Sequence, residues 1–189
     1  MRPRHPMPTP IPTRWLMTDE RLGEGLWQAL ERLPRGGGVV FRHYRTAARE
    51  RRALFERVVR VARRRHLTVV AAESRGLRSA DGTHHRVGFG MVTWPVHDAR
   101  EAVRARRAGA DVLFVSPLFP TRSHPGARAK GPVRARLAAG RGPGVLIALG
   151  GMDERRFRRV RPLGFAGYAA IDAWAAGPVS GQKRKAVPT

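Results

Sequence analysis

The chain has 189 residues, of which 42% are hydrophobic and 7% aromatic, enough for one packed domain with a sizeable core. It contains no cysteine, which excludes disulfides, thiolate zinc sites and a cysteine nucleophile. Lys+Arg 37 against Asp+Glu 14 gives a formal net charge of +23, an excess typical of proteins that bind nucleic acid or anionic membranes. Most of this excess is arginine spread along almost the whole chain, so we interpret it as solvated helix faces and rank nucleic-acid binding last among the candidate functions.

Both ends of the chain differ in composition from the rest. Residues 1–13 are basic and proline-rich without the apolar core of a secretory signal, which predicts a disordered basic leader. Residues 177–189 mix glycine, proline, lysine and arginine, which is typical of a flexible basic tail. No apolar run approaches the roughly 20 residues of a membrane span. We therefore expect one folded domain over 14–176, a cytoplasmic location and no membrane partner.

Strand-like and helix-like patterns alternate between these ends. In chain order, the sequence predicts a strand at 15–17, a helix at 22–30, a strand at 39–41, a helix at 47–64, strands at 67–72, 82–84 and 89–94, a helix at 98–108, strands at 111–115 and 145–149, a helix capped by Asp153, and a strand at 168–171. The segment 74–80 is too short and polar for a full helix.

This order of elements predicts the fold class. About eight strands in βα order indicate a parallel sheet with right-handed crossovers, and a compact (β/α)8 TIM barrel fits best. The chain is shorter than most such barrels, so some helices must be short or missing. A doubly wound open sheet is the structural alternative.

Active sites of such barrels lie at the carboxyl ends of the strands. The side chains that follow the predicted strands are therefore the candidates for chemistry. They are, strand by strand, Asp19, His43 with Arg45, Glu73, His84, His97, Thr121 to His124, Gly150-Gly151 and Asp172.

Three motifs in this series resemble a known family. Gly109-Ala110-Asp111, the run from Ser116 to His124 and the run from Ile147 to Met152 stand in the order and spacing of thiamine-phosphate synthase and its TenI-type relatives. The resemblance extends over roughly residues 14 to 175. It implies a (β/α)8 barrel and a transferase of thiamine biosynthesis. Such an enzyme joins hydroxymethylpyrimidine pyrophosphate to thiazole phosphate, uses magnesium and releases pyrophosphate.

The resemblance also implies roles for particular residues. It assigns catalytic roles to Arg45, His97 and His124, and substrate binding to His43, Thr121, Ser123, Gly131, Gly150 and Gly151. Gly150 and Gly151 match the phosphate-binding glycines, whose backbone N–H groups reach a phosphate without a side chain in the way. The alternative is that these two glycines only turn a strand into a helix.

The chain departs from the family pattern at the positions of the basic residues and of the metal-binding carboxylates. Of the family's Gln-x-Arg-x-Lys cluster, only Arg45 is retained, and the lysine of the pyrophosphate loop is replaced by His124. Glu73 is the one implied magnesium ligand, because no second carboxylate follows His84. Hard cations need several oxygen ligands, so a Mg²⁺ site with one carboxylate would be weak. The histidine of TenI-type tautomerases is also absent, since Pro117 stands in its place.

Four functions remain open after these departures. The first is a thiamine-phosphate synthase whose substrate cradle is rebuilt around Arg45 and His43. The second is a TenI-like member that binds or processes a phosphorylated thiazole or related metabolite. The third is another barrel enzyme with His84, His97 or His124 as general acid or base. The fourth is the nucleic-acid binder. The expected partners are small phosphorylated metabolites, and a homo-oligomer stays open.

Overall fold

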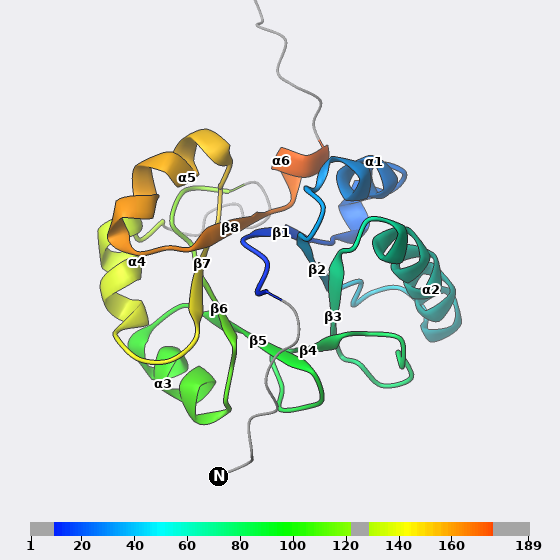
Figure 1. The fold of residues 1–189 in the computed structure, drawn as a ribbon, viewed down its shortest axis with the longest axis horizontal. Coiled ribbons are helices and arrows are strands. Elements are labelled where there is room, and N and C mark those ends of the chain that lie inside the picture. Colours follow the sequence, from blue (N-terminus) through cyan, green and yellow to red (C-terminus); the bar gives the residue numbers. More distant parts are fainter. Residues whose placement is uncertain (1–9, 122–128, 176–189) are drawn as a thin grey trace, which may run out of the picture.

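Eight parallel strands close into a barrel in a computed structural model, which describes residues 10–121 and 129–175 (Figure 1). Each strand pairs with the next one along the chain, and the first pairs with the last. The strands are β1 (Arg14–Met17), β2 (Gly38–Phe41), β3 (Thr68–Ala72), β4 (Gly82–His84), β5 (Met91–Val96), β6 (Val112–Val115), β7 (Val145–Leu149) and β8 (Gly167–Ala170). The predicted (β/α)8 barrel is confirmed, and the open-sheet alternative is wrong.

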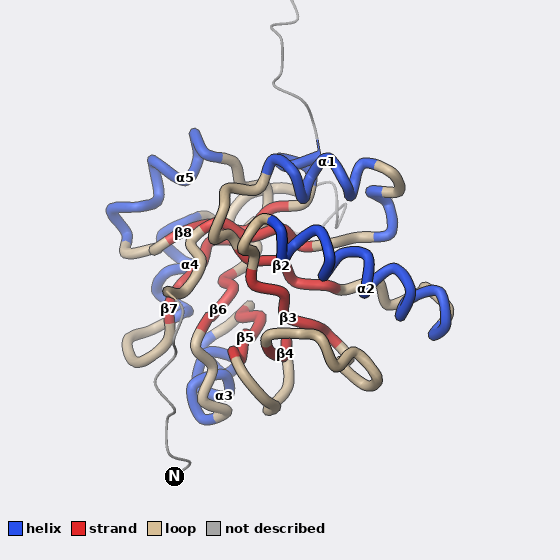
Figure 2. The backbone as a smooth tube through the Cα atoms, turned by 45° about the vertical axis from the view of Figure 1, so that its right-hand side comes forward, coloured by secondary structure: helices blue, strands red, loops and turns tan. Residues whose placement is uncertain are grey.

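Helices cover the barrel unevenly. They are α1 (Gly25–Arg32), α2 (Ala48–Arg64), α3 (Ala99–Arg107), α4 (Pro132–Ala139), α5 (Glu154–Val160) and α6 (Asp172–Ala175), with 3-10 turns η1 (Glu20–Leu22) and η2 (Arg161–Leu163). Residues 73–81 and 85–90, which join β3, β4 and β5, contain no helix and run as loops in Figure 2. The prediction of missing helices is therefore confirmed. The sequence did not predict α4.

Two helices, α3 and α5, are capped by the aspartates at which the sequence predicted a helix start, Asp98 and Asp153. The side chain of Asp98 accepts a hydrogen bond from the backbone N–H of Glu101 at 2.8 Å, and that of Asp153 accepts one from Arg156 at 2.7 Å. These bonds satisfy N–H groups that a helix start leaves without partners. Both caps lie just beyond the carboxyl ends of β5 and β7, so they fix where the chain leaves the end of the barrel.

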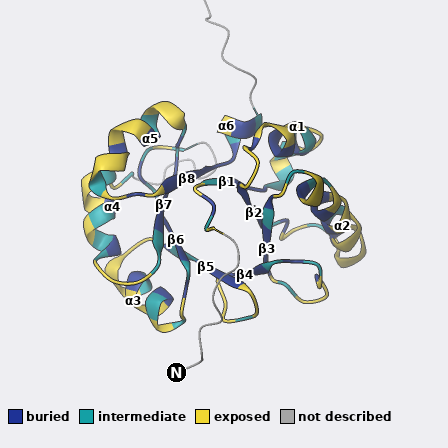
Figure 3. Cartoon of the chain, viewed as in Figure 1, coloured by how far each residue is buried: buried dark blue, intermediate teal, exposed yellow. Residues whose placement is uncertain are grey.

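The core has two parts because side chains on each strand alternate between the barrel interior and the helices. On β1, Trp15 and Met17 point into the barrel, whereas Leu16 packs outward. Figure 3 shows the strands buried and the outer faces of the helices exposed. Inside the barrel, the ring of Trp15 meets that of Phe114 edge-on, with 5.2 Å between centroids.

Trp15 determines the residue that faces it on β2. A Cβ atom at Gly38 would lie 2.3 Å from Cε3 of Trp15, closer than any packed carbon approaches, so only glycine fits. The indole N–H of Trp15 donates to the carbonyl of Pro12 at 2.7 Å. Ile11 packs against the same interior cluster. Within the described residues, Ile11 and Pro12 thus contact the barrel, although both belong to the stretch that the sequence assigns to a leader.

No helix in the described part of the chain is long and apolar enough to cross a membrane.

Candidate functional site

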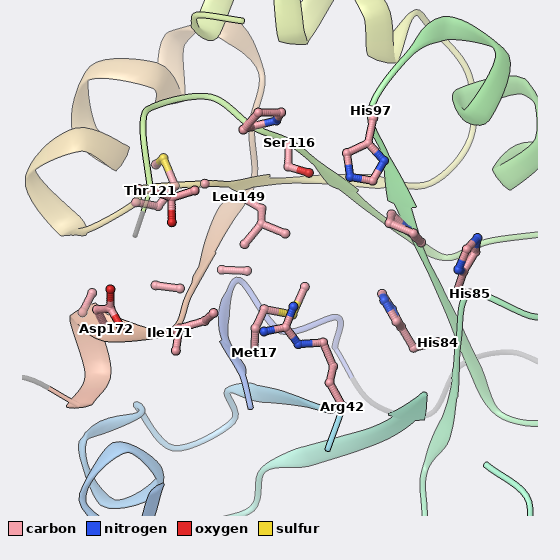
Figure 4. Close-up of a pocket in the computed structure, with 18 of the residues that line it drawn as sticks. Met17, Arg42, His84, His85, His97, Ser116, Thr121, Leu149, Ile171 and Asp172 are labelled. Carbon is pink, nitrogen blue, oxygen red and sulfur yellow. The ribbon is translucent and has the colours of Figure 1, made fainter. Parts of the chain in front are cut away.

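A cavity of about 400 Å³ opens where the carboxyl ends of the strands meet. Four apolar residues form its floor: Met17, Leu149, Ala169 and Ile171. Polar side chains stand above this floor. Figure 4 shows Arg42, His84, His85 and His97 along one side and Thr121 and Asp172 on the other. This end of a (β/α)8 barrel is where active sites form, because the loops after every strand converge there.

Strand alternation decides which side chains of β2 reach the cavity. Val40 faces the barrel interior, and residues two and four positions later continue the same face. Arg42 and Tyr44 therefore line the cavity. Arg45, the arginine that the resemblance selected, is an odd number of residues from Val40 and does not line the cavity. The signal that could have identified Arg42 was present in the sequence, as the period-two continuation from Val40.

Thr18 and Asp19, just after β1, hold Arg42 in place. Nε of Arg42 donates to the carbonyl of Thr18 at 2.9 Å, and its backbone N–H donates to the Thr18 hydroxyl at 2.9 Å. Nη2 lies 3.7 Å from Oδ2 of Asp19, which makes a loose ion pair. Burial lowers the pKa of Arg42, but a guanidinium stays charged at neutral pH. No described residue accepts a hydrogen bond from its Nη atoms, so these can donate to a ligand.

His84, at the end of β4, is a buried neutral acceptor. Its Nδ1 lies 2.9 Å from Oγ1 of Thr93, whose hydroxyl donates to the carbonyl of Thr83 at 3.4 Å. The Thr93 oxygen therefore accepts from Nδ1–H, which leaves Nε2 without a proton. Burial, together with the charges of nearby Arg42 and His85, lowers the pKa of His84 to about 3. A neutral imidazole can accept a hydrogen bond from a ligand but cannot neutralise an anion.

His85 and His97 are more exposed than His84. The ring of His85 stands edge-on against Trp94, with 5.3 Å between centroids. Nδ1 of His97 lies 2.8 Å from Oε2 of Glu101, and the ammonium group of Lys130 contacts the His97 carbonyl. Glu101 thereby orients the His97 ring, as a carboxylate orients a functional histidine in many sites.

Gly150 and Gly151 line the opposite wall. Both have positive φ, 99° and 58°, which L side chains rarely adopt. A Cβ at Gly151 would lie 2.4 Å from the carbonyl oxygen of Pro120, and one at Gly150 would lie 2.9 Å from Cα of Pro117. The turn itself thus requires both glycines. Both glycines line the cavity, so the structural explanation does not exclude the phosphate-binding role, which stays a prediction.

Asp172 places a carboxylate beside this glycine wall. The pKa of Arg21 is raised, first by its hydrogen bond to Asp19 and also by Asp172. A carboxylate at this position would repel a bound phosphate.

Several residues selected from the sequence lie outside the cavity lining. His43 points outward, stacks on Phe41 with 4.8 Å between ring centroids, and has Nδ1 3.0 Å from the Thr18 hydroxyl. Arg45 is exposed, and its backbone N–H donates to Glu20 at 2.8 Å. Their assigned roles remain predictions. Of the residues selected from the sequence, the cavity brings together His84, His97, Thr121, Gly150, Gly151 and Asp172.

Glu73 and Gly131 are also outside the lining. Glu73 has φ of 48°, its side chain is exposed, and its carbonyl accepts a hydrogen bond from Arg51 at 3.2 Å. Gly131, with φ of 76°, precedes the first residue of α4. Ser123 and His124 lie outside the described residues. Three residues that do line the cavity had no role predicted from the sequence: Arg42, Tyr44 and His85.

The donor set does not fit a magnesium site of the kind that the resemblance implies. Within residues 10–121 and 129–175, no group of three or more His, Asp or Glu side chains is arranged to hold a metal ion. All 14 Asp and Glu residues of the chain fall in these ranges, and Asp172 alone among them lines the cavity. One carboxylate leaves the other ligand positions of a Mg²⁺ ion to substrate phosphates and water, so the chain supplies no carboxylate cage for the ion.

Comparisons with known proteins agree with this architecture. A family model described as thiamine monophosphate synthase matches residues 80–174. The thiamine-phosphate synthase of Thermus thermophilus is 32% identical over 159 residues, which cover 74% of this chain and 77% of the relative. That of Geobacillus thermodenitrificans is 32% identical over 113 residues, 52% of this chain. The match spans about half, 51%, of the Geobacillus protein's length.

Solved structures share the fold. The thiamine phosphate pyrophosphorylase from Pyrococcus furiosus superposes with a TM-score of 0.71 and 23% sequence identity. The superposition covers 87% of this chain and 88% of that one. The same barrel thus extends over nearly the full length of both chains.

Proposed function

The chain belongs to the thiamine monophosphate synthase family, and from this premise we propose that it joins hydroxymethylpyrimidine pyrophosphate to thiazole phosphate with release of pyrophosphate. Its partners are then small phosphorylated metabolites. In this reaction the bond from the pyrimidine methylene carbon to the diphosphate oxygen breaks, and the electron pair leaves with pyrophosphate. The lone pair of the thiazole nitrogen forms the new carbon–nitrogen bond. No protein nucleophile is needed.

One observation carries the proposal: the cavity has two chemically different walls over an apolar floor. Arg42, His85 and His97 offer N–H donors on the side of β2, β4 and β5. Gly150 and Gly151 offer backbone on the side of β7. Two anionic substrates can therefore bind with their phosphates apart and their heterocycles over the floor. Positioning of this kind lowers the barrier to a two-substrate reaction.

The chemistry assigns a task to each wall. Negative charge grows on the diphosphate as its bond to carbon breaks, so the wall that contains the Arg42 guanidinium suits that group. The glycine wall suits the phosphate of the thiazole, which keeps its charge throughout the reaction. His84 accepts a hydrogen bond from a ligand N–H through its unprotonated Nε2. The floor excludes water from the reacting carbon.

Product formation tests the proposal. The purified chain is supplied with hydroxymethylpyrimidine pyrophosphate and thiazole phosphate, and thiamine phosphate and pyrophosphate are quantified separately. We expect both products in equal amounts. Pyrophosphate without thiamine phosphate would indicate hydrolysis, and silence at high enzyme concentration would refute the synthase.

A second candidate, a TenI-like protein that binds a phosphorylated thiazole without transferase activity, is favoured by the shortage of carboxylates at the cavity. Thermal unfolding separates the two functions. A binder is stabilised by thiazole phosphate and yields no product when both substrates are present. A synthase is stabilised and also turns over.

A further inference from the structure

All but one of the carboxylates of this chain lie outside the lining of the cavity, away from a metal that would be bound there. The fourteen Asp and Glu residues are all described, and only Asp172 lines the cavity. Glu73, which the family resemblance implies as a ligand, is exposed and outside the lining. The position after His84 carries His85, which is not a carboxylate.

The remaining carboxylates near the cavity already have basic or N–H partners. Asp19 accepts hydrogen bonds from the side chain of Arg21 at 2.9 and 3.3 Å. Burial raises the pKa of Asp19, but the Arg21 hydrogen bonds and the charges of Arg21 and Arg42 lower it overall. Glu20 accepts from the backbone of Arg45 at 2.8 Å, and Glu101 accepts from His97. Recruiting them to a cation would break these bonds.

The wall of the cavity that would face a diphosphate carries basic side chains and no carboxylate. Arg42 has Nη groups without a described acceptor. His85 contributes a ring N–H, and His97, whose Nδ1 lies 2.8 Å from Oε2 of Glu101, has Nε2 as its other ring nitrogen. Lys130 adds a positive charge beside the His97 carbonyl. Each N–H of a charged donor makes a stronger hydrogen bond to a phosphate oxygen than a neutral donor does.

We propose that this wall binds the diphosphate directly, through Arg42, His85 and His97, without a divalent cation held by protein carboxylates. The proposal rests on the synthase function only for the identity of the ligand as a diphosphate. The guanidinium and imidazole N–H groups then supply the positive charge that a carboxylate-held cation would otherwise bring to the leaving oxygen.

Calorimetric titration with inorganic pyrophosphate tests this without any turnover. The wild-type chain is titrated once in EDTA and once in excess MgCl₂, at the same pH and ionic strength. We expect the dissociation constant in EDTA to lie within about threefold of that in MgCl₂. Affinity that falls more than tenfold in EDTA, or no binding in EDTA, overturns the proposal. Titration with Mn²⁺ followed by electron paramagnetic resonance should give no protein-bound signal, and tight Mn²⁺ binding by the chain alone would contradict it.

Variants locate the binding wall. In EDTA, Arg42→Ala and His97→Gln should each weaken pyrophosphate binding, the first by about tenfold or more. Arg49→Ala removes an exposed arginine of α2 outside the cavity lining and should change affinity less than twofold. If circular dichroism shows that Arg42→Ala does not fold, pyrophosphate binding by His97→Gln and by the wild-type chain in EDTA still tests the proposal. Unchanged binding in His97→Gln together with a folded, unchanged Arg42→Ala overturns the assignment.

The pyrophosphate titration and the product assay can refute the two proposals separately. Metal-free pyrophosphate binding without thiamine phosphate formation refutes the synthase and leaves the binding wall standing. Product formation that requires Mg²⁺ for pyrophosphate affinity refutes the wall and leaves the synthase standing.

Discussion

Replacing Arg42 by alanine is the most direct way to separate the geometry from the family pattern. The substitution removes the guanidinium that lines the cavity, whereas Arg45→Ala removes one that lies outside the lining. A hydrogen bond from a charged donor is worth about 1.5–3 kcal/mol. At about 1.4 kcal/mol per tenfold, its loss from the transition state lowers kcat/KM by roughly 10- to 150-fold. We expect the loss from Arg45→Ala to be at least tenfold smaller.

The assay is the initial rate of thiamine phosphate formation at subsaturating pyrimidine pyrophosphate. Arg42 also donates to the Thr18 carbonyl, so part of any effect could come from stability. Rates are therefore measured well below the melting temperature of each variant. Arg42→Lys keeps the charge without the planar fork and should recover only part of the lost rate. A larger loss of kcat/KM in Arg45→Ala than in Arg42→Ala would refute the assignment of Arg42, and not Arg45, to the cavity.

Three further predictions follow from single contacts. Gly38→Ala should lower the free energy of unfolding by about 1–3 kcal/mol, since the new Cβ meets the Trp15 ring, and urea denaturation at constant m-value checks this. Gly151→Ala should raise KM for thiazole phosphate with a smaller change for the pyrimidine substrate, because its Cβ disturbs the β7 wall; equal changes for both would contradict the assignment. The pKa of His84 is about 3 in the folded chain and near 6.5 in the unfolded chain. Between these pH values the unfolded chain therefore binds one more proton at this residue than the folded chain does. The contribution of His84 to stability is complete above pH 6.5 and is lost progressively as the pH falls toward 3. His84→Gln should flatten the slope of the free energy of unfolding between pH 7 and pH 4, and an unchanged slope would show that other groups cause it.

Much of the barrel could be predicted from local patterns. Apolar runs such as 111–115 and 145–149 are typical of buried parallel strands, and both lie within one residue of β6 and β7. Asp153 marked a helix start because a short oxygen-bearing side chain caps N–H groups. Helix α4 was missed because its apolar residues do not all face the core: Val133 and Leu137 are 59% and 73% exposed.

The site could be predicted only where side chains follow a strand directly. His97 is the next residue after β5, and Gly150 the next after β7, so strand parity and proximity place both at the cavity. On β2, the family resemblance selected Arg45 and passed over Arg42, whose place at the cavity follows from its spacing of two residues from the inward-facing Val40. At Glu73, a positive φ of 48° accompanies an exposed side chain, and glutamate gives no sequence signal for that conformation.

The two helix-free connections around β4 have a consequence for motion. β4 has three residues and is joined to its neighbours by loops alone, so few outer contacts oppose its local separation from the barrel. Segments of this kind exchange their amide hydrogens through small openings long before the whole domain unfolds. His84 and His85 sit at this point of the barrel wall. A ligand that contacts them would restrain this short strand, and slowed hydrogen exchange at β4 would report that the ligand is bound.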